Sequence, residues 1–275
     1  MKKYPVALQL YSVRDFCEKD FEGTIKKLKD FGYDGVEFAG TFGRPAAELC
    51  DYCKSIGIVP ISAHVSYDEL MSNVEGVVRY YAEVGCKYIS IPYLVEEYRP
   101  GGEKYDEFVK NLKVISAECK KYRIDLLYHN HDFEFKKIDD VYVLDKLYTD
   151  LTADELKTQL DLCWVNVGGE NPSTYLLKYA GRAPVVHFKD FAGKASDKMY
   201  ALIGIDDDTD TSKKEDSAFE FRPVGYGYQN FPEIMKSVEA AGTDWIVVEQ
   251  DQASMGKSSL ECAEMSINYL KTING

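Results

Sequence analysis

Short apolar runs alternate along this chain with longer segments whose apolar positions have helical spacing. Runs of this kind, rich in Val and Ile, are typical of strands that are buried on both faces of a parallel sheet. Several of the longer segments end at a glycine, which suits the left-handed residue that closes a helix. The pattern predicts strands at residues 6–10, 35–38, 58–63, 88–91, 124–128, 157–162, 185–188 and 245–249.

Amphipathic segments follow each of these strands, which is the arrangement of a parallel sheet with crossover helices. The expected helices lie at about 21–31, 45–56, 67–84, 103–122 and 140–148, from 171 onward, and at 231–241 and 258–270. Eight strand–helix units in a chain of 275 residues predict a single-domain (β/α)8 barrel, or TIM barrel, over residues 1–275.

Two segments depart from this rhythm. Residues 192–222 form a long polar insertion, and both a lid over the barrel and a solvated acidic flap are compatible with it. Residues 132–135 alternate between polar and apolar positions beyond the fifth strand. We expect this second segment to extend the strand and to carry Glu134 over the barrel mouth.

Ionisable residues stand at the carboxyl ends of the apolar runs. Three of them are His64, His129 and His187, and two more are Asp161 and Glu249. Because the parallel strands of a barrel deliver their last side chains to one face, these residues are expected to form one polar site. Imidazole and carboxylate donors together suit a divalent ion such as Mn²⁺, Zn²⁺, Co²⁺ or Mg²⁺.

Strand alternation places Lys189 on the same side as His187, and Asp251 on the same side as Glu249. His187 and Glu249 are the strongest candidates, because each ends an apolar run where an unpaired charge is costly. Glu37 ends the second run, and it either joins the site or pairs with a neighbouring cation.

The composition limits the partners of this protein. A formal net charge of -13 argues against nucleic acid and against anionic membranes, and no apolar stretch is long enough to span a bilayer. The seven cysteines have no framework spacing, which indicates the reducing cytoplasm, and Cys50 and Cys53 fall on a helix as buried thiols. We expect a small-molecule partner, and a homo-oligomer is compatible with the sequence.

Seven motifs spread along the chain resemble those of a known superfamily. They are LQLYSVR at 8–14, GYDGVEF at 32–38, YHNHDFEF at 128–135, DLCWV at 161–165, VHFKD at 186–190, PVGYG at 223–227 and VEQD at 248–251. The chain resembles the sugar phosphate isomerase/epimerase superfamily, which has the xylose isomerase-like barrel and includes inosose dehydratase, ketose 3-epimerases and endonuclease IV. The resemblance covers nearly the whole chain.

In this superfamily a metal ion is held by Glu, Asp, His and Glu from successive strand ends. The resemblance assigns the Asp to Asp161, the His to His187 and the last Glu to Glu249. For the first carboxylate we favour Glu134, and His129, which ends the fifth strand, is the alternative. One divalent metal ion is the implied cofactor.

The implied reaction is isomerisation or epimerisation of a sugar or keto-sugar, by proton abstraction next to a carbonyl through a metal-stabilised enediolate. Glu134 and Glu249 are the acid–base candidates, with His129, His131 and His64 as alternatives, and Lys189 is expected to hold a substrate oxygen. The residues expected to bind the carbohydrate are Tyr11, Glu37, His64, Tyr93 and Trp164.

Other readings of the same sequence remain open. A lyase or dehydratase of the inosose or 3-keto-glycoside type shares the first chemical step, and a non-catalytic sugar-binding subunit shares the barrel. Trp164 stands where many ketose epimerases have a second histidine, which argues against a plain ketose 3-epimerase. The acidic charge argues against the endonuclease branch. No glycine-rich phosphate loop follows the seventh or eighth strand, so an unphosphorylated sugar is favoured.

Overall fold

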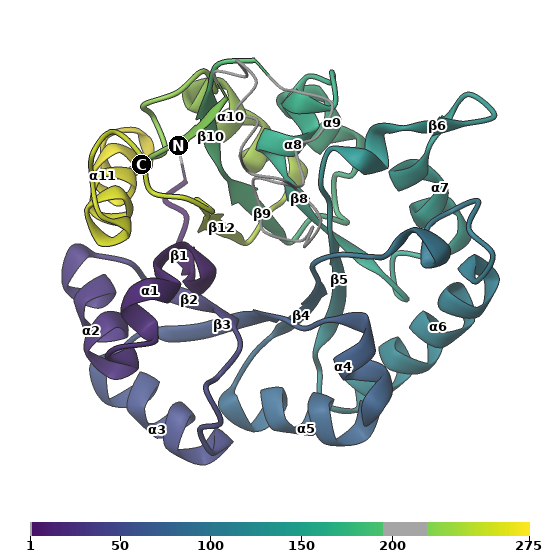
Figure 1. Cartoon of the computed structure of the whole chain (residues 1–275), viewed down its shortest axis with the longest axis horizontal. Helices are drawn as coiled ribbons and strands as arrows, with labels where there is room; N and C mark the ends of the chain where they lie inside the picture. Colours follow the sequence, from purple (N-terminus) through teal and green to yellow (C-terminus); the bar gives the residue numbers. More distant parts are fainter. Residues whose placement is uncertain (1, 195–218) are drawn as a thin grey trace, which may run out of the picture.

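The computed structural model describes residues 2–194 and 219–275. Its centre is a closed barrel of parallel strands in the order β1-β12-β9-β8-β5-β4-β3-β2 (Figure 1). The barrel strands are β1 (Val6–Gln9), β2 (Gly35–Ala39), β3 (Val59–His64), β4 (Tyr88–Ile91), β5 (Asp125–His129), β8 (Lys157–Asp161), β9 (Val185–Phe188) and β12 (Trp245–Val248). The predicted (β/α)8 barrel is confirmed.

Helices surround the barrel as a continuous ring (Figure 1). They are α2 (Phe21–Phe31), α3 (Ala46–Ile56), α4 (Tyr67–Ser72), α5 (Val74–Val84), α6 (Tyr105–Lys121), α7 (Val143–Asp150), α9 (Pro172–Lys178), α10 (Phe231–Ala241) and α11 (Ser259–Ile273). The single helix predicted at 67–84 is wrong, because Asn73 interrupts it. The Asn73 side chain accepts a hydrogen bond from the Gly76 N–H and begins α5.

Shorter elements decorate the carboxyl ends of the strands. They are η1 (Leu10–Val13), α1 (Arg14–Cys17), η2 (Glu96–Tyr98), η3 (Phe133–Phe135), α8 (Leu162–Val167) and the hairpins β6–β7 (Lys137–Ile138, Val141–Tyr142) and β10–β11 (Asp190–Ala192, Glu220–Arg222). The strand extension predicted at 132–135 is wrong, because residues 133–135 form the short 3-10 helix η3. The insertion begins and ends in the β10–β11 hairpin, and the predicted lid or flap falls outside the described residues.

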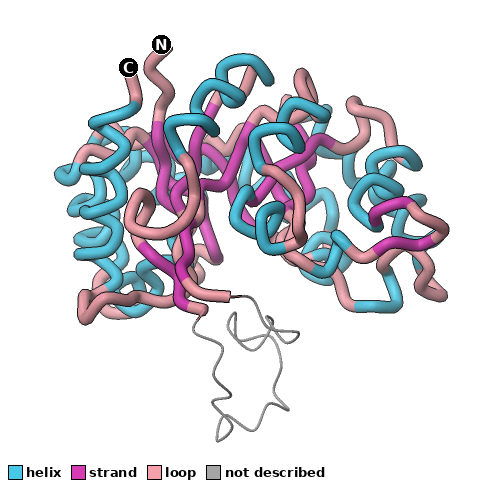
Figure 2. The backbone as a smooth tube through the Cα atoms, turned by 90° about the horizontal axis from the view of Figure 1, so that it is seen from above, coloured by secondary structure: helices cyan, strands magenta, loops and turns pink. Residues whose placement is uncertain are grey.

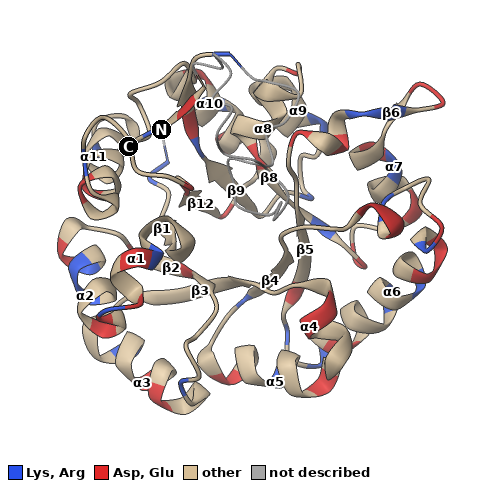
Figure 3. Cartoon of the chain, viewed as in Figure 1, with Lys and Arg blue, Asp and Glu red and all other residues tan. Residues whose placement is uncertain are grey.

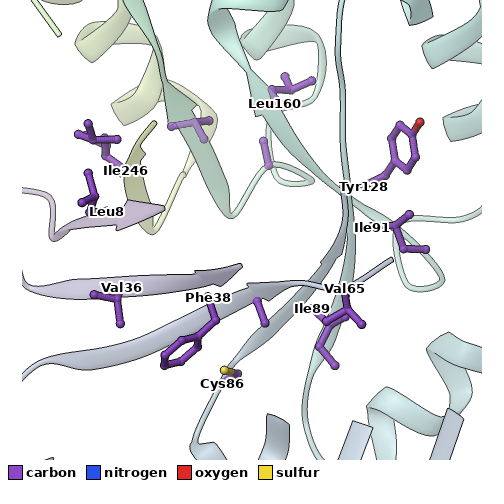
Figure 4. Packing of buried hydrophobic residues seen from close by; sticks show 14 of the residues in the cluster. Leu8, Val36, Phe38, Val65, Cys86, Ile89, Ile91, Tyr128, Leu160 and Ile246 are labelled. Atoms are coloured by element: carbon purple, nitrogen blue, oxygen red, sulfur yellow. The ribbon is translucent and has the colours of Figure 1, made fainter. Parts of the chain in front are cut away.

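Apolar side chains fill two separate layers of the molecule. Outward-facing strand residues pack against the helices, as Figure 4 shows for Phe38 and Tyr128. A second cluster fills the interior of the barrel and consists of Ala7, Ile61, Tyr88, Leu127, Val185 and Val247. Because side chains alternate along a strand, the next inward positions lie two residues further on, and in five of the six strands these positions are polar. In β3 the register shifts, and the polar residue beyond Ile61 is His64. The apolar layer thus forms the floor of a polar one.

The chain termini lie at one end of the molecule and the β10–β11 hairpin at the opposite end (Figure 2). All seven cysteines are free and buried, so Cys50 and Cys53 contribute to the packing of α3. Acidic and basic residues are interspersed around the outer helices (Figure 3). None of the described helices is long and apolar enough to cross a membrane.

Candidate active site

Four buried side chains from neighbouring strand ends converge above the apolar floor. They are His129, Asp161, His187 and Glu249, and their potential ligand atoms all lie within 4.8 Å of one another. The strand register explains why two of these residues are neighbours, since Asp161 of β8 pairs with His187 of β9. His129 Nε2 lies 3.9 Å from Asp161 Oδ2 and 3.9 Å from Glu249 Oε2, and His187 Nδ1 lies 2.9 Å from Glu249 Oε2. The four residues form a compact donor set.

Local backbone structure orients the Asp161 carboxylate. Asp161 is the N-cap of α8, and its Oδ1 accepts hydrogen bonds from the N–H groups of Cys163 and Trp164. The Asn130 side chain accepts from the Asp161 N–H, which joins the end of β5 to the end of β8. The other carboxylate oxygen, Oδ2, faces His129, His187 and Glu249. Among the described residues, no hydrogen-bond donor is aligned with it.

Glu37 lies in the middle of β2, with its carboxylate beside the His187 ring, and is fully buried. Its carboxylate oxygens contact five side chains from four other strands, at 2.5 to 3.0 Å. These side chains are Gln9, Ser62, His64, Gln159 and His187. Glu37 approaches Nε2 of His187, the nitrogen opposite the one that faces Glu249, and so it fixes the rotation of the imidazole ring.

The charges of the donor set are strongly coupled. Burial and the neighbouring His187 keep the pKa of His129 well below its usual range, so its imidazole is neutral. Burial alone would lower the pKa of His187, but Glu37 and Glu249 raise it to about 10. Burial alone would raise the pKa of Glu249, but Lys189 and His187 hold it well below its usual range. The His187 ring thus lies between two carboxylates, Glu37 and Glu249, which stabilise its protonated form.

Lys189 is a buried cation beside the donor set. Its ammonium lies 3.3 Å from Asp161 Oδ2, 3.0 Å from Glu249 Oε2 and 2.9 Å from Asp251 Oδ2. Burial alone would lower the pKa of Lys189, but these carboxylates raise it well above its usual range. Burial raises the pKa of Asp251 to about 6. Lys189 therefore carries a hydrogen-bond donor and a permanent charge to the barrel mouth.

Aromatic rings form one wall of the site. The His131 ring lies 5.2 Å from that of His129 and 5.7 Å from that of Trp164. Trp164 packs with Phe219 and Phe221 at the base of the β10–β11 hairpin, and the Lys189 ammonium lies 5.3 Å from its ring centroid. Burial lowers the pKa of His131 to about 3, which keeps this ring neutral. The wall offers flat apolar surface beside a cluster of charges.

Glu134 is not part of the donor set. Its carboxylate accepts hydrogen bonds from the Tyr128 hydroxyl at 2.5 Å and from the His131 N–H at 2.8 Å. Tyr128 points outward from β5 into the core between strands and helices (Figure 4), so this contact turns Glu134 away from the barrel interior. At the end of β5, the side chain that lies among Asp161, His187 and Glu249 is that of His129, the alternative that the sequence offers.

Glu134 makes a testable contribution to the pH dependence of stability. Burial raises its pKa from 4.5 to about 7, so the folded state holds a proton that the unfolded chain releases. This contribution is complete below pH 4.5 and is lost as the pH rises to about 7. We expect the free energy of unfolding to fall by about 3 kcal/mol across this window relative to Glu134→Gln.

Urea denaturation of the two proteins with a chelator present, at several pH values, measures this difference. Glu233→Gln, on the exposed side of α10, is the matched control and is expected to keep the wild-type slope. Identical slopes for Glu134→Gln and the wild type would show that Glu134 is ionised in the folded protein.

The remaining predicted residues lie at the margin of the site. Tyr93 lies 6.1 Å from the His131 ring, and its hydroxyl accepts a hydrogen bond from Arg99. Tyr11 stacks on Arg14, whose guanidinium donates to the main-chain carbonyl of Asp251. The structure thus brings Tyr93 close to the aromatic wall. Arg14 lies between Tyr11 and Asp251 at the edge of the charged cluster.

Gln9, Gln159 and Asp251 were not assigned to the site from the sequence. Gln9 and Gln159 donate to Glu37, and Asp251 pairs with Lys189. Strand alternation is the signal that finds them, because Gln159 and Asp251 lie two residues from Asp161 and Glu249 on the same sides of their strands.

The PVGYG segment at 223–227 has a structural explanation. The Asp190 carboxylate accepts hydrogen bonds from the N–H groups of Gly225, Gly227 and Gln229. A Cβ atom at Gly227 would lie 2.3 Å from Asp190 Oδ1, so the close approach requires glycine. The two glycines let this loop wrap around a buried carboxylate at the edge of the site.

Comparison with known proteins agrees with this fold. The profile of the xylose isomerase-like TIM barrel family matches residues 25–273, and the chain belongs to this family. Inosose dehydratase of Lacticaseibacillus casei is 22% identical over 174 residues, which are 61% of this chain and 54% of that protein. The match spans about half of the length of this curated relative.

Solved structures share the architecture over the whole chain. A sugar phosphate isomerase/epimerase from Parabacteroides distasonis ATCC 8503 has a TM-score of 0.74 at 20% identity, over 98% of this chain and 94% of that one. The IOLI protein, crystallised with a zinc atom, has a TM-score of 0.72 at 15% identity, over 99% of this chain and 98% of that one. At these identities the likeness shows the fold.

Proposed function

We propose that the protein is a divalent-metal-dependent isomerase or epimerase of a sugar or keto-sugar. The observation that carries this proposal is the buried set of His129, Asp161, His187 and Glu249 at the carboxyl ends of four adjacent strands. Catalytic groups of TIM-barrel enzymes occupy this end of the barrel. The family of the chain consists of enzymes with this architecture, which supports a catalytic role.

The donor set suits a metal ion in the chemistry of its groups, and His187 would release its proton when the ion binds. Two imidazoles and two carboxylates are ligands that Mn²⁺, Zn²⁺ or Co²⁺ accept, and Asp161 Oδ2 is a buried carboxylate oxygen without an aligned donor. We propose His129, and not Glu134, as the ligand from β5. When bound, the ion would supply Lewis acidity to the carbonyl of the substrate.

Each residue in and around the set has a separate role in the proposed reaction. We assign proton abstraction to Glu249, because it is a carboxylate in its ionised form and its Oε2 faces the centre of the set. Lys189, 3.0 Å away, is positioned to donate a hydrogen bond to the substrate oxygen on which negative charge develops. The neutral His131 ring and Trp164 exclude water from one side and offer surface to the sugar.

A dehydratase on the same site is the second candidate. The similarity to inosose dehydratase of Lacticaseibacillus casei favours it, and its first step is the same proton abstraction. The two reactions differ in whether a β-substituent leaves. Release of water from the substrate identifies the dehydratase, and an isomer of unchanged mass identifies the isomerase or epimerase.

Metal analysis of Asp161→Asn beside the wild type tests the proposed function. The purified wild-type protein should bind about one Mn²⁺, Zn²⁺ or Co²⁺ per chain, and Asp161→Asn should bind it at least about tenfold more weakly. Asp30→Asn, on the exposed face of α2, is the matched control. Equal metal affinity in all three proteins would refute the assigned donor set. The metal-loaded protein is then screened with sugars for exchange of the α-proton in deuterated water.

A further inference from the structure

The ammonium group of Lys189 contacts the oxygen atoms that the proposed function assigns to a metal ion. Its Nζ lies 3.3 Å from Asp161 Oδ2 and 3.0 Å from Glu249 Oε2. The same two oxygens approach Nε2 of His129, each at 3.9 Å. The Lys189 side chain is only 1% exposed, so water does not surround its charge. A buried cation and the donor set therefore share two carboxylates.

This sharing creates a conflict between Lys189 and a divalent ion. Like charges repel, and the repulsion is stronger in a buried site than in water. The carboxylates of Asp161 and Glu249 together balance the two charges of such an ion, and they then no longer balance Lys189. A buried charge without a partner is costly, so the ammonium needs a counter-charge of its own.

The surroundings of Lys189 offer one further carboxylate. Among the described residues, the third ion pair of Lys189 is with Asp251, whose Oδ2 lies 2.9 Å from Nζ. The other neighbours are aromatic, with the ring centroids of Trp164 and Phe221 5.3 and 5.4 Å from Nζ. Aromatic rings attract a cation but do not neutralise it. Asp251 is therefore the group that can balance Lys189 when Asp161 and Glu249 hold an ion.

Asp251 lies outside the donor set, and its main chain is held by other contacts. It is buried, but it does not belong to the group whose ligand atoms lie within 4.8 Å of one another. Its main-chain carbonyl accepts a hydrogen bond from Arg14 Nη1 at 2.8 Å, and the Gln250 N–H donates to the Ser12 hydroxyl at 3.0 Å. These contacts tie the segment after β12 to the segment after β1. The position of Asp251 is thus fixed without the metal ligands.

We propose that Asp251 is a positioning residue whose carboxylate is the counter-charge of Lys189, so that the ammonium group and a divalent ion occupy the site together. This inference rests on the proposed function, because it takes Asp161 and Glu249 as metal ligands. It gives Asp251 a role that is neither metal binding nor proton transfer. An ammonium has three N–H donors, so the contact with Asp251 leaves others for a substrate oxygen.

A double-mutant cycle of Zn²⁺ binding, measured by calorimetry, tests this role. It comprises the wild type, Asp251→Asn, Lys189→Met and the variant with both substitutions. Asp251→Asn leaves the ammonium with only the two ligand carboxylates as charged partners, so Zn²⁺ affinity should fall at least about tenfold. In the Lys189→Met background this competition is absent, and the loss caused by Asp251→Asn should be at least about fivefold smaller. Direct attraction between Asp251 and the ion is present in both backgrounds and cancels in the cycle.

Equal losses in the two backgrounds would show that Asp251 binds the ion or only supports the fold, and they would overturn the inference, as would unchanged affinity in Asp251→Asn. Circular dichroism checks the fold, and the exposed Asp30→Asn is the matched control.

If Asp251→Asn did not fold, the double variant would carry the test. It lacks both charges and should bind Zn²⁺ within about threefold of the wild type, whereas a loss of about tenfold or more would overturn the inference. The metal analysis of Asp161→Asn reports separately on the proposed function. A wild type that bound no Zn²⁺ would refute both, and an additive cycle in a protein that binds Zn²⁺ through Asp161 would refute the role of Asp251 alone.

Discussion

Glu249→Gln is expected to lower the rate of α-proton exchange by about 10³- to 10⁴-fold. The amide preserves the size of the side chain but cannot accept the proton. It also removes the negative charge that Lys189 and His187 contact at 3.0 and 2.9 Å. Because one of four donors is lost as a carboxylate, metal affinity should fall at least about tenfold as well. The secondary structure should be preserved, since the substitution is nearly isosteric.

Proton exchange with solvent deuterium, metal titration and circular dichroism measure these three effects on one preparation. Glu233→Gln makes the same chemical change on the exposed surface of α10 and is expected to retain both the exchange rate and the metal affinity. If Glu249→Gln kept the wild-type rate, the base would be another residue. If it kept the metal affinity while losing the rate, Glu249 would act on the substrate without binding the ion.

Glu37→Gln is expected to weaken metal binding about 10- to 100-fold although Glu37 is not assigned as a ligand. Burial alone would raise the pKa of Glu37, but His64 and His187 hold it well below its usual range, so it is an anion in contact with both rings. The neutral amide no longer holds the His187 ring with Nδ1 toward Glu249. Glu37→Ala leaves His187 without this partner in a buried place and should cost about 3–5 kcal/mol of stability.

Calorimetric metal titration and the ¹⁵N chemical shifts of the His187 ring distinguish positioning from simple loss of fold. Ser62→Ala removes one hydrogen bond to the Glu37 carboxylate and keeps its charge, so it should cost about 2 kcal/mol and leave metal affinity within a few-fold of the wild type. An unchanged ring spectrum and unchanged metal affinity in Glu37→Gln would show that His187 is oriented without Glu37.

The secondary structure of this barrel was largely predictable because its signals are local. Alternation of apolar runs with amphipathic segments predicts eight strands and their helices, and the helix-ending glycines Gly32, Gly57, Gly85 and Gly242 all have positive φ. The predicted helix that the structure divides also has a local cause. Asn73 divides one expected helix, because its side chain offers the backbone a cap in the middle of an amphipathic pattern.

The candidate site was predictable in outline for a similar reason. In a parallel barrel every strand ends on the same face, so a histidine or carboxylate after an apolar run is directed to a common place. His129, Asp161, His187 and Glu249 follow from this rule. Strand alternation further indicates Lys189 and Asp251 on the same sides.

The different positions of Glu134 and His129 depend on the tertiary structure. The segment after β5 folds into a 3-10 helix, and the Tyr128 hydroxyl and His131 N–H hold Glu134 outside the barrel. These contacts depend on how a short loop packs against the core, and no pattern of apolar and polar residues encodes the direction of such a loop.

The sequence by itself therefore determined the barrel, its order of elements and the face on which ionisable side chains gather, because these depend on periodicity and on strand direction. The tertiary structure decided the partners of each charged group, such as Glu37 between His64 and His187, and Lys189 beside Asp251. Those features join residues far apart in the chain, and their energies depend on distances and burial that exist only once the barrel has closed.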